Sequence, residues 1–174
     1  MNTATRRSQI LVTIGYIAML IGAIDPMEGS LIILPGSGLV LLGTYLSHKE
    51  RRFITYRLWV FLMIVFGVAA LWGSTVLGGI GGETAYSMWW GLLFLPYPIG
   101  WSIGIWGPDS PRWVLWSGIV MGIWYIVMML LAIKMSDNFG EAAVSVMIFV
   151  GFIGIIGVIS IAGCIYRLRK RGAE

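Results

Sequence analysis

Charged residues are scarce in this sequence. Asp, Glu, Lys and Arg make up 11% of its 174 residues, whereas 58% are hydrophobic. Soluble domains carry roughly 25% charged and 45–50% apolar residues. Because so little charge cannot cover a water-exposed surface, the composition excludes an ordinary soluble globule, a disordered chain and a nucleic-acid-binding module. It predicts a membrane protein that is surrounded by the lipid bilayer and has no nucleic-acid partner.

Cysteine and histidine occur once each, as Cys164 and His48. A single cysteine cannot form an internal disulfide. One cysteine and one histidine are also too few for a His/Cys metal cage or a bis-His haem. We therefore expect neither a metal site nor a cofactor.

Acids and bases are missing from the middle of the long apolar runs, which argues against a proton pump or a voltage sensor. Arg57 lies about one turn inside the third predicted helix, where its side chain can snorkel to water. Ser37 and His48 are 11 residues apart on one predicted helix, about 16 Å. They cannot form a nucleophile–base pair, so we expect no enzyme and no catalytic residue.

Six runs contain no Asp, Glu, Lys or Arg and are 17 to 25 residues long. A membrane-spanning helix needs about 20 apolar residues, with a range of roughly 17–25. Lipid offers no hydrogen bonds to the backbone, so each run should be helical. The sequence therefore predicts an all-α fold, a bundle of six transmembrane helices with short loops in a single domain, 1–174. We expect the helices over residues 8–24, 30–47, 53–79, 85–107, 111–133 and 142–166.

The first two runs are short and allow alternatives to two separate spans. Together they could form one re-entrant hairpin, which leaves four spans and keeps every later loop on the same side. Arg6 and Arg7 before an apolar run also resemble a secretory signal. Because no small-x-small cleavage site precedes Asp25, we expect a retained first span.

The basic residues indicate the orientation. With a cytoplasmic N-terminus and six spans, 11 of the 12 Lys and Arg residues face the cytoplasm and only Lys134 faces out. This asymmetry follows the positive-inside rule. We expect a multi-pass protein of the plasma (inner) membrane with both termini cytoplasmic.

Glycine is abundant, with 24 residues, and some glycines follow the small-x-x-x-small pattern that brings membrane helices close together. Two interpretations are open: packing between helices of one chain, or a contact face for a second protein. The candidate packing face comprises Gly100, Gly104, Gly118, Gly122, Gly151 and Gly154.

Nine tryptophans predict an aromatic belt at the membrane interfaces. Trp59, Trp101, Trp106, Trp113 and Trp116 fall near the cytoplasmic interface in this topology.

Proline should interrupt two of the spans, at Pro35 in the second and at Pro96 and Pro98 in the fourth. Broken helices free backbone carbonyls, and in transporters such breaks mark the binding site. The candidate solute path comprises Pro35, Ser37, Pro96, Tyr97, Pro98, Trp101 and Ser102.

Two functions fit these observations. The first is a structural or accessory subunit without catalytic activity, which packs in a homo-oligomer or a larger membrane complex. Small size, short loops and abundant glycine favour it. The second is a small channel or transporter for a neutral or amphipathic solute, through the broken second and fourth helices.

Overall fold

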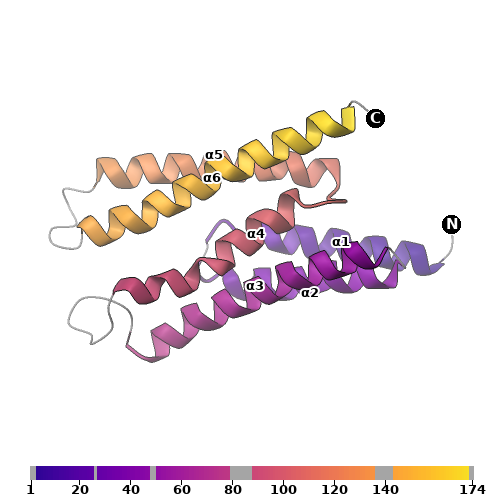
Figure 1. Cartoon of the computed structure of the whole chain (residues 1–174), viewed down its shortest axis with the longest axis horizontal. Coiled ribbons are helices and arrows are strands. Elements are labelled where there is room, and N and C mark those ends of the chain that lie inside the picture. The colour runs from indigo at the N-terminus through magenta and orange to yellow at the C-terminus, as the bar shows by residue number, and fades with distance from the viewer. Residues whose placement is uncertain (1–2, 26, 48–49, 79–87, 136–142, 173–174) are drawn as a thin grey trace. The chain divides into compact units, whose positions relative to one another are not determined.

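The computed structural model describes residues 3–25, 27–47, 50–78, 88–135 and 143–172, and its regular elements in these ranges are all helices (Figure 1). The prediction of an all-α fold is confirmed for this part of the chain. The α-helices are α1 (Thr3–Gly22), α2 (Ser30–Leu46), α3 (Arg51–Val76), α4 (Pro96–Trp106), α5 (Arg112–Lys134) and α6 (Ala143–Gly172), and a 3-10 helix, η1 (Met88–Phe94), precedes α4.

Within the residues that the structure describes, three helical segments are long and apolar enough to cross a membrane. They are α3, α5 and the part of α6 from Val150 to Lys170. α2 and the segment Gly91–Trp106 are apolar but shorter. These helices indicate a membrane protein, and the count of six spans stays a prediction.

The chain divides into two compact units, Met1–Asp109 and Ser110–Glu174. The first contains α1 to α4 with η1, and the second is the hairpin of α5 and α6. The single transmembrane domain expected from the sequence also stays a prediction.

In the first unit, α1 and α2 pack antiparallel along a seam of glycines. A Cβ atom at Gly15 would lie 2.6 Å from the carbonyl oxygen of Gly36, and one at Gly36 would lie 2.9 Å from that of Gly15. Such distances leave no room for a side chain, so the two backbones touch directly. The seam glycines recur every seven residues, at Gly15, Gly22, Gly29, Gly36 and Gly43.

α3 and α4 also pack closely at glycines. A Cβ atom at Gly100 would lie 3.0 Å from the Cβ of Met63, and one at Gly104 would lie 3.1 Å from Val60. On the α3 side, a Cβ at Gly67 would lie 2.5 Å from the Cβ of Tyr97. Close contact therefore runs from Val60 to Gly67 along α3, and it positions α4 against that helix.

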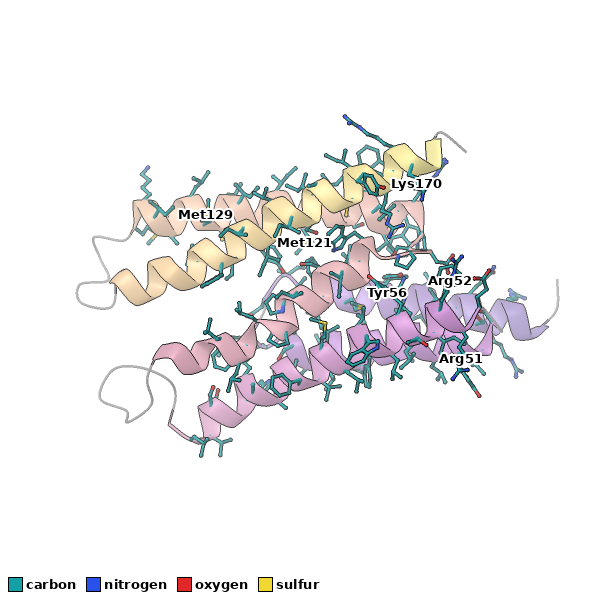
Figure 2. The ribbon with its side chains drawn as sticks, in the orientation of Figure 1. Arg51, Arg52, Tyr56, Met121, Met129 and Lys170 are labelled. Atoms are coloured by element: carbon teal, nitrogen blue, oxygen red, sulfur yellow. The ribbon has the colours of Figure 1, made fainter. Side chains whose placement is uncertain are left out.

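The second unit is held together in a similar way. Gly122 of α5 and Gly157 of α6 face each other, and a Cβ on either would lie 2.8 Å from the carbonyl oxygen of the other. One turn or two farther along, a Cβ at Gly154 would meet the side chain of Met129, which Figure 2 labels on α5. Close packing at glycines thus holds neighbouring helices together in both units.

Candidate functional site

Arg57 is the residue whose position departs most from the expectation. It is the seventh residue of α3, about 9 Å along a helix of about 39 Å. The sequence predicts that its side chain reaches water, but the residue is only 5% exposed. The prediction of a snorkelling arginine is therefore wrong, because the guanidinium finds its hydrogen-bond acceptors inside the first unit.

The guanidinium of Arg57 joins three helical segments. Its Nη1 donates to the carbonyl oxygen of Gly104 at 2.7 Å, and its Nη2 donates to that of Pro108 at 3.1 Å and to the hydroxyl of Tyr16 on α1. Its central carbon lies 5.4 Å from the ring centre of Tyr16 and 5.6 Å from that of Tyr56. A cation within about 6 Å of an aromatic ring is attracted to it.

The end of α4 explains why an arginine is needed here. The last four carbonyls of an α-helix have no partner in the helix, and α4 ends at Trp106. Ile103 and Gly104 belong to this last turn, where Tyr56 donates its hydroxyl to Ile103 and Arg57 donates to Gly104. A positive charge also interacts favourably with the negative end of the helix dipole. Arg57 and Tyr56 thus cap α4 from the neighbouring helix.

Beyond the cap, the chain turns sharply. Asp109 has φ 70°, in the left-handed region that favours glycine and that aspartate tolerates better than most residues. The turn follows directly after Pro108, whose carbonyl accepts from Arg57. Arg57 therefore fixes both the last turn of α4 and the segment that leaves it.

Trp101 adds a second link between α4 and α1. It is 2% exposed, and its Nε1 donates to the carbonyl oxygen of Met19 at 2.9 Å. The sequence assigns Trp101 to the aromatic belt, whereas the structure buries it between helices. By contrast, Trp59, Trp113 and Trp116 of the predicted belt are exposed.

Figure 2 shows Tyr56 on the side of α3 toward the end of α4, where the cluster around Arg57 lies.

The cluster offers little for catalysis. A guanidinium is always protonated in proteins, so it cannot act as a general base. Within the described ranges, no group of three or more His, Cys, Asp or Glu residues could hold a metal ion. The arrangement of Arg57, Tyr16 and Tyr56 is suited to holding helices in place.

The candidate path residues of α2 do not break the helix. α2 is continuous from Ser30 to Leu46 with Pro35 inside it, and Pro35 is exposed while Ser37 is buried. The Ser37 hydroxyl donates to the carbonyl oxygen of Leu34 at 2.8 Å. Proline removes one backbone donor, and packing against α1 along the glycine seam keeps the rest of α2 helical.

The fourth predicted span is broken where proline predicts it. From Met88 on, the expected helix over 85–107 is the 3-10 helix η1 followed by α4, which begins at Pro96; residues 85–87 lie outside the described ranges. Tyr97 and Ser102 are buried, as is Trp101, and Pro98 is half-buried. Tyr97 packs on Gly67 and Trp101 on α1, so the structure places these side chains in helix contacts.

The six candidate glycines differ in their surroundings. Gly100, Gly104, Gly122 and Gly154 contact neighbouring helices of their own unit, and Gly118 is buried. A Cβ at Gly151 would meet nothing within 4 Å. For the first four, these contacts favour packing within the chain over a face for a second protein.

Comparisons with protein-family models, with curated proteins and with solved structures give no match.

Two features escaped sequence reasoning. The glycine seam carries a visible signal, because its five glycines are spaced by seven residues, a period that keeps residues on one helix face. No signal in the sequence gives the direction of the Arg57 side chain, because its acceptors Gly104 and Pro108 lie 47 and 51 residues away.

Proposed function

We propose that this chain is an integral membrane protein that crosses the plasma (inner) membrane six times, has both termini in the cytoplasm and acts as a structural or accessory subunit without catalytic activity. The observation that carries the proposal is the Arg57 cluster. The one charged group known to be buried in the described part of the first unit is used to fasten α4 to α1 and α3. A buried charge whose hydrogen bonds link helices to each other fits a structural subunit.

Helix lengths support six crossings. At 1.5 Å per residue, α1 and α2 are about 30 and 26 Å long, against a hydrocarbon core of about 30 Å. At about 2.0 Å per residue for η1 and 1.5 Å for α4, the two together also reach about 30 Å. α1, and η1 together with α4, therefore match the thickness of the core, whereas α2 is about 4 Å shorter than it. The distribution of Lys and Arg supports cytoplasmic termini.

The assembly would involve a second copy of the chain or a larger membrane complex. Because most candidate glycines pack inside their own unit, the contact must use outward apolar faces. One such face runs along α5 and consists of exposed side chains at helical spacing, namely Trp116, Val120, Ile123, Val127 and Leu130. Exposed apolar stripes of this kind suit contact with lipid or with another membrane helix.

Purification in a mild detergent, followed by measurement of the particle mass, tests this function. The proposal predicts a particle heavier than one chain with its detergent, either an oligomer or a complex with another membrane protein. A particle that contains a single chain and no partner would contradict it. The variant Gly73→Ala, at a glycine with open space around it, serves as a control for handling.

A transporter is a second candidate because of two polar atoms on α4. Ser102 Oγ and Trp106 Nε1 are buried without a hydrogen-bond partner among the described residues. They lie four residues apart and hence on one face of the helix. A buried donor without a partner is a place where water or a polar solute could bind. A single-chain particle that speeds solute exchange across vesicles would favour this candidate.

A further inference from the structure

A groove of about 450 Å³ lies between α2 and α3, on the outside of the first unit. It is lined by four residues of α2 between Gly38 and Tyr45 and by Ile54, Leu58 and Phe61 of α3. Apart from the Tyr45 hydroxyl, this lining is apolar. Since Leu42, Tyr45 and Leu58 are exposed, the groove opens outward.

Gly38 and Phe61 lie at one end of the groove, where a Cβ atom at Gly38 would lie 3.4 Å from the ring of Phe61. At the other end lie Tyr45 and Ile54, next to the connection between the two helices. Between these ends each helix advances seven residues, about 10 Å. One leaflet of the hydrocarbon core is about 15 Å deep, so the groove fits within one leaflet.

A basic residue, Arg51, lies one helical turn beyond Ile54, at the end of the groove formed by Tyr45 and Ile54. Arg51, Ile54, Leu58 and Phe61 follow steps of three, four and three residues, which places them along one face of α3. Helical side chains lean toward the N-terminus, so Arg51 leans from the groove toward the membrane surface. Figure 2 shows Arg51 and Arg52 at this end of α3. Arg52 is engaged with Glu50 at 2.6 Å and with the Phe53 ring at 4.9 Å.

We propose that this groove binds one acyl chain of an anionic phospholipid, with the lipid phosphate at Arg51. An apolar groove with a cation at its interfacial end complements an amphiphile with a negative head. The inference depends on the membrane location of α3 and is independent of the assembly role.

Photo-crosslinking of the full chain in lipid nanodiscs tests the groove. The probe is phosphatidylglycerol with a photoreactive group in its acyl chain, diluted in phosphatidylcholine, and mass spectrometry maps the labelled residues. We expect labels on the groove residues of α2 and α3. Leu42→Trp, which fills the groove, should lose them, whereas Leu31→Trp, at an exposed position of α2 outside the groove, should keep them.

The arginine pair tests the head-group contact. Arg51→Gln should lower phosphatidylglycerol labelling by at least about fivefold. Arg52→Gln should lower it less, because Arg52 is engaged with Glu50 and the Phe53 ring. Equal effects of the two substitutions would mean surface attraction without a site and would overturn the proposal. Labels spread evenly around α2 and α3 would overturn it as well. Crosslinks between two copies of the protein through the groove would also overturn it.

Discussion

At the scale of single residues, Arg57 determines how the end of α4 is held. Its guanidinium reaches the last turn of that helix, the carbonyl of Pro108 and the hydroxyl of Tyr16. Three segments distant in sequence, α1, α3 and the end of α4, therefore meet at one side chain. Burying a charge is costly unless it is hydrogen-bonded, and here the acceptors are backbone carbonyls that need a donor. The same contacts that satisfy the arginine therefore satisfy the helix end.

The substitution Arg57→Leu should lower the free energy of unfolding by about 3 kcal/mol. It removes hydrogen bonds from a charged donor to two backbone carbonyls, and such bonds contribute roughly 1.5–3 kcal/mol each. Thermal unfolding of the purified protein in detergent measures the loss. Arg52→Leu is the matched control, because its ion pair with Glu50 is exposed and contributes at most about 1 kcal/mol. Equal losses in the two variants would argue against the capping role.

At the scale of the helices, glycine seams determine which elements pair. α1 and α2 approach each other at backbone distance over the whole seam, from Gly43 against Val12 to Gly22 against Ile33. The hydroxyl of Ser8 donates across the same seam to the carbonyl of Gly43 at 2.7 Å. In lipid, where the hydrophobic effect does not drive helices together, such close packing and interhelical hydrogen bonds provide much of the attraction.

Gly15→Ala and Gly73→Ala should shift stability in opposite directions. A methyl group at Gly15 would lie 2.6 Å from a backbone oxygen of α2, so the helices must separate, and overpacking of this kind costs about 1–3 kcal/mol. At Gly73, in the last turn of α3, a methyl group meets nothing, and replacing this helical glycine should gain at most about 0.5–1 kcal/mol. Unfolding curves of the two variants give the comparison. A stable Gly15→Ala protein would rule out direct backbone contact at the seam.

The proline-containing helices show how far sequence reasoning reaches. Composition and the long apolar runs were enough to predict an all-α membrane protein, and Pro96 correctly marks where α4 begins. Pro35 carries the same local signal, yet α2 continues through it. The difference lies in tertiary contacts, because Gly36 next to Pro35 packs against Gly15 and Met19 of α1. Such contacts depend on a partner helix that a local pattern does not specify.

At the scale of the whole molecule, the described part of the chain has three helices that are long and apolar enough to span a membrane. The remaining predicted spans rest on α1, α2 and η1 with α4. The six-span topology connects these observations, because six crossings bring the two ends of the chain to one side. The six-span topology also places 11 of the 12 basic residues on the same side as the two ends. Four spans with a re-entrant α1–α2 hairpin keep the same side for both termini, whereas an odd number of crossings would separate them.

Reporter fusions at both termini of the full chain test this topology most directly. A reporter active only in the cytoplasm and one active only outside are attached in turn to each end, and activity is compared with expression. The account predicts that the cytoplasmic reporter is active at both termini and the external one at neither. Activity on opposite faces for the two ends would contradict the membrane topology and, with it, the proposed function.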